Sequence, residues 1–174
     1  MLDLLPDEVW TDPDLKWLDP CCKSGVFLRE IASRLLDRLR EWEPDFEKRR
    51  EHVFRSMLYG TSITELTGMI ARRSVYCSRD ASGEHSIVKF EDPEGLIPFI
   101  PTEHDFGKHG KAKSCTVCGA PVDLDRGSGR ENYAYSFIHG TYPTQELSDM
   151  KFDVIVGNPP YQIDSDGNTR TMPV

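Results

Sequence analysis

Long apolar runs are absent from the 174-residue sequence. No stretch approaches the roughly 18 consecutive apolar residues that a membrane-spanning helix needs. The N-terminal segment MLDLLPDEVW is acidic and has no basic region, so it does not have the pattern of a signal peptide. These two absences predict a soluble, cytoplasmic protein without a membrane partner.

An excess of positive charge is absent as well, since 21 basic residues stand against 29 acidic residues and give a net charge of −8. A surface that binds nucleic acid is usually basic, because the phosphate backbone is anionic. If the protein acts on a nucleic acid, its basic surface is therefore expected outside these residues.

The cysteines do not form an even, regularly spaced set. There are five of them, and Cys21 and Cys22 are adjacent, an arrangement that rarely cross-links a fold. Without a signal peptide, the sequence predicts thiols or metal ligands and argues against a disulfide framework. Internal repeats are also absent, and 38% hydrophobic residues suffice for one ordinary globular core.

What the sequence does contain is an alternation of strand-like and helix-like segments. The segments 16–19 (KWLD) and 57–62 (MLYGTS) are strand candidates, and a short helix is expected at 53–57. The segment after the first strand has apolar residues at spacings of three or four, which predicts a helix whose stripe faces the core: Phe27, Ile31, Leu35, Leu39 and Trp42. After the second strand, Ser62 to Glu65 fits a capping box that starts another helix. This order predicts an α/β fold with a parallel sheet.

The alternation stops between residues 77 and 130, where Gly, Pro, Asp and Lys are frequent and only SIVKF and LIPFI resemble strands. It resumes with YAYSFIH at 133–139 and with the apolar run at 154–156. We therefore divide the chain into a first half of the core at 1–76, an insertion at 77–130 and further core at 131–174.

The first candidate ligand site is the segment LDPCCKSGVFL at 18–28. A strand ends at Asp19, a turn of small residues follows, and a helix begins. In open α/β sheets, ligands bind at the carboxyl ends of the strands. A helix N-terminus there offers free N–H groups, and Gly25 allows a close backbone approach. The alternative is a tight strand-to-helix turn without a ligand.

The second candidate site is KFDVIVGNPPYQ at 151–162, where an apolar strand ends at a glycine. Asn158 follows the strand, and Pro159 and Pro160 keep their carbonyl groups in a rigid frame. Tyr161 offers a ring for stacking. The side-chain oxygen of Asn158 and the carbonyl of Pro159 can accept the two hydrogens of an amino group on a planar ring. The alternative is a proline-rich loop that only ends the strand.

Together, DPCCKSGVFL and DVIVGNPPYQ resemble the motifs of amino-group methyltransferases that use S-adenosylmethionine. The sequence is most similar to N6-adenine DNA methyltransferases of restriction-modification systems, in the class where the cofactor motif precedes the catalytic motif. The resemblance extends from about Trp17 to Gln162. It implies a partial doubly wound parallel sheet, the Rossmann-like methyltransferase core. Into this core we expect a small zinc-ribbon-like insertion, which the cysteine spacing described below predicts.

The resemblance also implies roles for individual residues. The cofactor would contact the turn after the first strand, at Asp19, Pro20, Cys21, Lys23, Gly25 and Phe27. A flipped adenine would bind at Asn158, Pro159, Pro160 and Tyr161, of which Asn158, Pro159 and Tyr161 are the implied catalytic residues. Methyl transfer would be in line and without a covalent enzyme intermediate, so that positioning does most of the work.

The sequence departs from the family pattern at two positions. Lys23 stands where the family usually has glycine, so its side chain must point outward or contact the cofactor carboxylate. Ser62 stands where the family tends to place an acid that binds the ribose hydroxyls. Glu65 lies one turn further on and is the candidate for that role, although its place in the capping box competes with it.

The segment CTVCGAP at 115–121 has the spacing of a metal-binding knuckle. We predict a structural zinc site with four protein ligands: Cys77, Cys115, Cys118 and His104. His85 is an alternative fourth ligand, and His109 is a weaker one. Reduced, buried thiols without a metal are the alternative to the site. His139 could line the cofactor pocket, although such a histidine is more often structural.

Two rival functions stay open. Protein glutamine methyltransferases share NPPY, and a methyltransferase core that has lost catalysis could serve binding alone. The resemblance implies double-stranded DNA as a partner, through a recognition domain outside these residues, and a restriction subunit or a fused nuclease. The last residues, 163–174, show no strand or helix pattern. The sequence therefore predicts a fragment of a longer enzyme, inactive alone and with an exposed sheet edge.

Overall fold

The computed structural model describes residues 1–62, 64–101, 103–107, 115–117, 136, 139–140, 149–158, 162–163 and 169–170. Its centre is a sheet of three parallel strands in the order β2-β1-β3. The strands are β1 (Trp17–Asp19), β2 (Leu58–Gly60) and β3 (Val154–Ile155). The predicted α/β fold with a parallel sheet is confirmed, and each strand lies where the sequence placed one.

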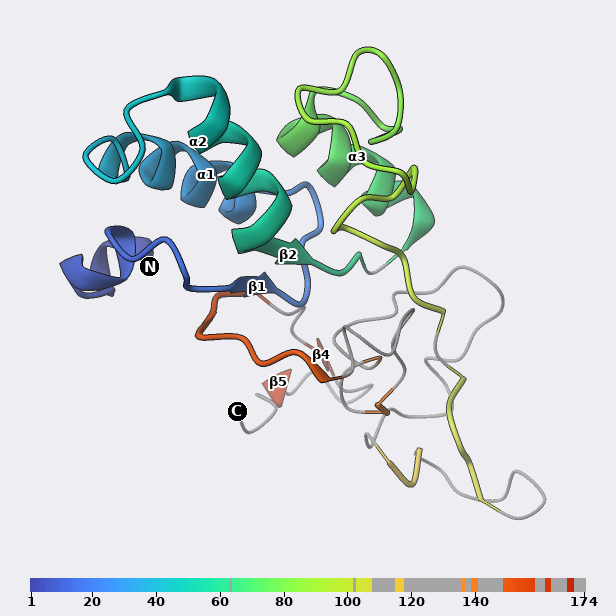
Figure 1. The fold of residues 1–174 in the computed structure, drawn as a ribbon. Helices are drawn as coiled ribbons and strands as arrows, with labels where there is room; N and C mark the ends of the chain where they lie inside the picture. The colour runs from blue at the N-terminus through green and yellow to red at the C-terminus, as the bar shows by residue number, and fades with distance from the viewer. Residues whose placement is uncertain are drawn as a thin grey trace.

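Three helices lie on the same side of β1 and β2 (Figure 1). They are α1 (Val26–Arg38), α2 (Phe46–His52) and α3 (Glu65–Tyr76). Two short 3-10 helices, η1 (Leu2–Leu4) and η2 (Asp7–Trp10), precede the sheet. Helices on a sheet face bury the apolar side chains of both layers, which is the packing that an α/β domain requires.

The apolar stripe of α1 faces the core for most of its predicted length. Leu28, Ile31 and Leu35 are fully buried, and Leu39 caps the helix. The prediction is wrong at Trp42, which is 47% exposed. Because α1 ends at Arg38, Trp42 is no longer in helical register with the stripe, and its ring instead packs on His52.

The chain enters the second strand from a π-helix, a form that is rare in proteins. α2 continues into a π-helical turn, η3 (Val53–Met57), which leads directly into β2 at Leu58. Val53, Phe54 and Met57 are buried on the core. The short helix predicted at 53–57 therefore exists, in π-helical form and preceded by α2.

The helix after β2 does not begin as predicted. The capping box is formed by Thr64, whose Oγ1 accepts the N–H of Thr67 at 3.1 Å, and by the Thr67 hydroxyl, which accepts the N–H of Thr64 at 2.9 Å. Ser62 cannot serve as the cap, because its N–H and its hydroxyl both donate to the carbonyl of Pro98, at 3.0 and 3.3 Å. Glu65 is therefore the first helical residue and takes no part in the capping box.

The chain after α3 continues to pack on this core. The N–H of Gly60 donates to the carbonyl of Leu96 at 2.9 Å, and Ser62 forms a parallel bridge with Phe99. The LIPFI segment therefore returns to the end of β2, but it forms only an isolated bridge and is not the strand that its composition suggested. Ala81, Val88 and Ile97 belong to the same hydrophobic cluster as the helices. The segment SIVKF is not a strand in the structure.

Arg72 holds this returning segment against α3. Its guanidinium donates to the carbonyls of Arg79 and Ile97, at 2.8 and 3.0 Å, and to Glu94 Oε1 at 2.9 Å. Arg72 is only 5% exposed, and a buried charge is tolerated where it is paired and hydrogen-bonded. The proposed division of the chain at residues 76 and 130 stays a prediction, as does a zinc-ribbon-like form for the insertion.

The C-terminal residues contain a second, smaller ladder. β4 (Gln162–Ile163) pairs antiparallel with β5 (Thr169–Arg170). The expectation that 163–174 would form no strand is therefore wrong. Among the described residues, no helix is long and apolar enough to cross a membrane. The predicted strand at 133–139 lies outside the described residues except for residues 136 and 139.

Candidate functional site

The two predicted ligand segments meet at the carboxyl edge of the sheet. β1 pairs directly with β3, with Leu18 opposite Ile155, and the N–H of Val156 donates to the carbonyl of Leu18 at 2.9 Å. A Cβ built on Gly157 would lie 3.5 Å from Asp19 Oδ1. The end of one motif therefore lies against the start of the other, and Asn158 follows, exposed to solvent.

The turn after β1 is held by its own hydrogen bonds. Asp19 Oδ1 accepts the N–H of Cys21 at 3.0 Å, and the carbonyls of Cys21 and Cys22 accept the N–H groups of Lys23 and Gly25, at 2.8 and 2.7 Å. These bonds give the small-residue turn one conformation, which places the start of α1 at the sheet edge.

Thr61 joins this turn to the end of β2. Its N–H donates to the carbonyl of Asp19 at 3.0 Å, and its hydroxyl donates to the carbonyl of Pro20 at 2.8 Å. Its own carbonyl accepts the N–H of Cys22 at 3.0 Å. Sequence reasoning missed Thr61. Its position directly after a predicted strand, at the edge where ligands bind, was the only signal for it.

Gly25 is required by packing as well as by conformation. Its φ is 72°, in the left-handed region that favours glycine. A Cβ at this position would lie 3.0 Å from the carbonyl oxygen of Ala71 in α3. The close backbone approach that the sequence predicted for Gly25 is therefore made to another helix. Phe27, two residues on, packs partly buried against the core.

The carboxyl group of Asp19 has unusual electrostatics. It is 2% exposed, and burial raises its pKa to about 6, against the opposing effects of the Cys21 N–H and the positive charge of Lys23. The positive charge of Lys23 thus lowers the pKa of the Asp19 carboxyl group at the centre of the turn, although less than burial raises it. Near neutral pH, Asp19 is mostly an ionised carboxylate held in a poorly solvated position, which favours the approach of a cationic group.

The two adjacent cysteines are packing residues. Cys21 and Cys22 are 4% and 2% exposed. Burial, followed by the nearby charge of Asp19, raises the pKa of the Cys22 thiol well above its usual range. A nucleophilic cysteine needs the opposite shift and solvent access. Neither residue has the environment of a nucleophile.

The position that the family usually fills with an acid is closed to ligands here. Ser62 is 1% exposed and engaged with Pro98, and a Cβ on Gly68 would lie 2.6 Å from its hydroxyl. Glu65 is exposed at the start of α3, and the Thr64–Thr67 cap leaves its carboxylate out of the capping box. The structure thus removes the competing role that the sequence assigned to Glu65.

The other predicted residues for the second site are only partly described. Pro159, Pro160 and Tyr161 lie outside the described residues. Phe152, which precedes β3 in the chain, packs edge-on against Tyr59 of β2, with ring centroids 5.4 Å apart. This aromatic contact joins the segment that enters β3 to the strand two places away in the sheet.

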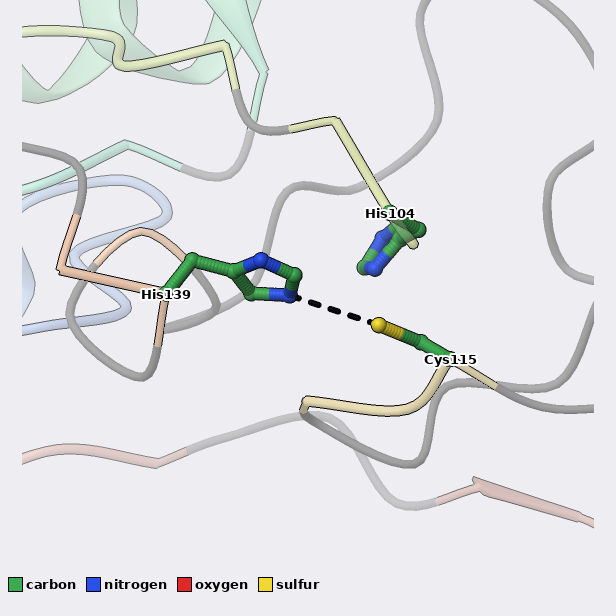
Figure 2. Close-up of side chains that lie close together, drawn as sticks. All are labelled: His104, Cys115 and His139. Carbon is green, nitrogen blue, oxygen red and sulfur yellow. Dashed lines mark hydrogen bonds between the residues drawn. The ribbon is translucent and has the colours of Figure 1, made fainter. Parts of the chain in front are cut away.

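Of the predicted metal ligands, His104 and Cys115 lie close together, and His139, which was not predicted to bind metal, lies beside them. His104, Cys115 and His139 place one ligand atom each within 4.8 Å of one another (Figure 2). Cys77 is not part of this cluster, because it is the exposed C-cap of α3. His85 is also apart, with its side chain 84% exposed beside Glu84. Cys118 and His109 lie outside the described residues. The position of His139 beside His104 and Cys115 is the second feature that sequence reasoning missed.

Comparisons with known proteins agree on one family. Residues 56–172 match the family described as Eco57I restriction-modification methylase. A protein of Mycoplasma pneumoniae (strain ATCC 29342 / M129 / Subtype 1) is named "Uncharacterized adenine-specific methylase". It is 40% identical to this chain over an alignment of 193 residues, gaps included, which covers 97% of this chain and 46% of that protein. The chain therefore spans about half the length of this relative.

A solved structure also matches most of this chain. It is the "ATP-dependent Type ISP restriction-modification enzyme LlaBIII bound to DNA", with a TM-score of 0.48 and 19% identity over 94% of this chain and 10% of that one.

Proposed function

Because the chain belongs to the family of Eco57I restriction-modification methylases, we propose that it is part of an enzyme that methylates adenine in DNA. The methyl donor is S-adenosylmethionine, the acceptor is N6 of the adenine, and the enzyme serves a restriction-modification system. The relative named as an adenine-specific methylase supports this substrate. Double-stranded DNA is the proposed partner, together with a restriction subunit or a nuclease.

The observation that carries the proposal is the pairing of β1 with β3. Neighbouring strands are about 4.8 Å apart, so the turn at Asp19 and the amide of Asn158 share one end of the sheet. A methyl donor at the first and an amino group at the second would therefore lie within reach of each other. Holding two reactants in this way supplies a large part of the rate enhancement in a transfer reaction.

The residues on the donor side suit S-adenosylmethionine chemically. α1 begins at Gly25 without a side-chain cap and has no acidic residue in its first turn, which leaves its N–H groups for a carboxylate. The poorly solvated carboxylate of Asp19 suits the ammonium group, and the exposed carboxylate of Glu65 suits the ribose hydroxyls. When bound, this cofactor supplies an electrophilic methyl group on a sulfonium centre.

The residues on the acceptor side orient an amino group. Asn158 and the carbonyl of Pro159 accept the two N6 hydrogens, and Tyr161 stacks on the adenine. The base must leave the duplex to reach them. Both acceptors would hold these hydrogens in a tetrahedral arrangement, so that the nitrogen lone pair points at the methyl group. As the N–CH₃ bond forms, the bond between sulfur and the methyl carbon would break, and N6 would then release one proton to solvent. No residue of the chain has to form a covalent bond.

A glutamine side chain offers a similar NH₂ group, so a protein glutamine methyltransferase is the second candidate. The turn DPCCKSG lacks the glycine-rich pattern of those enzymes, which favours the DNA substrate. A labelled methyl group that appears on protein and not on duplex DNA would support the second candidate. A core that only binds would show no cofactor binding or no turnover on either substrate.

The test is Asn158→Ala in the complete protein. We expect turnover on DNA to fall by at least about 100-fold, as when one stabilising contact to a reacting group is removed. Cofactor affinity, measured by calorimetry, should stay near that of the unchanged protein, because Asn158 contacts the base.

Two variants make this test specific. Asn158→Asp keeps an acceptor oxygen and should retain more activity than Asn158→Ala. Lys151→Ala changes an exposed residue before the same strand and should leave turnover unchanged. Near-normal turnover in Asn158→Ala would rule out the proposed role of this residue.

A further inference from the structure

We propose that His104, Cys115 and His139 bind one Zn²⁺ ion, and that this ion joins three separate parts of the long segment between α3 and β3. The site is independent of the methyl-transfer residues and has a different ligand set from the one that the sequence predicted. His139 takes the place that Cys77 was expected to fill.

The geometry fits zinc without a large rearrangement. The Cys115 Sγ atom lies 3.6 Å from Nε2 of His139. Two ligands on a tetrahedral zinc ion, with one Zn–S and one Zn–N bond, are separated by about 3.6 Å. The His104 and His139 rings are 5.4 Å apart at an interplanar angle of 76°, so both rings can direct a nitrogen at one point. Figure 2 shows the three side chains converging from three separate segments.

The backbone around Cys115 already has features of a metal-binding knuckle. The N–H of Val117 donates to the Cys115 sulfur at 3.5 Å, a contact that stabilises negative charge on a thiolate. Cys115 is 3% exposed, whereas both histidines are half-buried. A sulfur enclosed in this way, with two imidazoles facing it, is better suited to holding a metal ion than to attacking a substrate.

Residues next to the ligands fix their positions. The N–H of Thr116 donates to the carbonyl of Asp105 at 2.8 Å, and the Thr116 hydroxyl donates to Asp105 Oδ2 at 2.9 Å. Asp105 follows His104, and Thr116 follows Cys115. These hydrogen bonds therefore hold together the two backbone segments that carry two of the ligands. Supporting contacts of this kind orient the ligands in natural metal sites.

The donor set selects the metal. One sulfur and two imidazole nitrogens suit zinc, whereas Mg²⁺ and Ca²⁺ prefer oxygen ligands. A structural zinc site has four protein ligands. Cys118, which follows Cys115 at the C-x₂-C spacing, is the fourth ligand that the sequence predicts, although it lies outside the described residues.

The first test is the metal content of the full-length protein, purified without chelator. We expect one zinc ion per chain, and visible absorption typical of tetrahedral cobalt with a sulfur ligand after replacement by Co²⁺. His139→Ala should lower zinc affinity by at least about 100-fold, and His139→Cys, which keeps a ligand atom, should restore much of it. Cys77→Ala and His85→Ala are the matched controls and should keep the full zinc content.

The second test does not depend on variants that fold. Zinc should protect Cys115 from alkylation, and a chelator should remove this protection. Equal alkylation of Cys115 with and without chelator would overturn the proposal and support a metal-free thiol–imidazole pair.

The variants of the first test give a further contradicting outcome. A protein that loses its zinc in Cys77→Ala but keeps it in His139→Ala would also overturn the proposal.

Discussion

Asp19 is the residue in which stability and function conflict most directly. Its pKa lies near 6 in the folded protein because burial opposes ionisation. Proton binding is therefore stronger in the folded than in the unfolded chain. The stability that the protonated form provides is complete below about pH 3.8, and it is lost as the pH rises through 6. Above that pH, ionised Asp19 lowers the free energy of unfolding by about 3 kcal/mol.

We predict that Asp19→Asn raises the free energy of unfolding at pH 7.5, by up to about 3 kcal/mol. The same change should weaken cofactor binding, because the amide carries no charge for the ammonium group. Urea unfolding at pH 7.5 and at pH 4 measures the first effect, which should nearly vanish at the lower pH. Asp14→Asn, an exposed position, is the control. A destabilised Asp19→Asn at pH 7.5 would contradict the prediction.

At the residue level, Asp19 and Asn158 could be identified as strand-end residues, because an acid or an amide directly after an apolar run is visible in the order of the residues. It could not identify Thr61 or His139. Thr61 matters through hydrogen bonds to Asp19 and Pro20, which depend on strand register. His139 lies 24 positions from Cys115, so only the folded chain brings the two together.

Among the elements, the segment between α3 and residue 101 depends most on one side chain. Arg72 donates to three acceptors there, Arg79, Glu94 and Ile97, and it is nearly buried. Removal of the guanidinium leaves the buried carbonyl of Ile97, the carbonyl of Arg79 and the Glu94 carboxylate without this donor. Glu94 also accepts the N–H of Phe99 at 3.3 Å, so the loss would extend to the residue that forms the bridge with Ser62.

We predict that Arg72→Ala destabilises the protein by roughly 2 kcal/mol, because the buried carbonyl of Ile97 loses its hydrogen-bond donor. Arg73→Ala, on the exposed side of the same helix, should change stability by less than about 0.5 kcal/mol. Chemical denaturation of both variants measures the difference. Similar stabilities for the two would mean that the 77–101 segment is held by its apolar side chains alone.

Periodicity predicted the helices and strands better than it predicted their ends. The pattern Ser62–Glu65 and the pattern Thr64–Thr67 both suit a helix start, and the structure uses the second because Ser62 is engaged by Pro98. The stripe of α1 was extended to Trp42 because spacing alone does not show where a helix stops. The parallel bridge between Ser62 and Phe99 could not be predicted, because composition marks a strand-like segment without showing which residue it will lie beside.

For the whole molecule, the sheet is asymmetric. The described helices α1, α2 and α3 cover one face (Figure 1), and Ile155 on β3 is 64% exposed. β3 is also the last strand in the described order β2-β1-β3. The exposed sheet edge that the sequence predicts stays a prediction, and edges of that kind attract further strands.

The pairing of β1 with β3 joins parts of the chain that are far apart in sequence. Lys16 and Asp153 are in contact across 137 positions, whereas Pro20 and Thr61 are separated by 41. Closing the longer loop costs about 1 kcal/mol more in chain entropy, so the β1–β2 unit should form first. Pulse-labelled hydrogen exchange during refolding should protect the amide of Thr61 before that of Val156. Equal rates would contradict this order. If it holds, the turn proposed to bind the cofactor folds first, and Asn158 joins a half of the proposed site that is already formed.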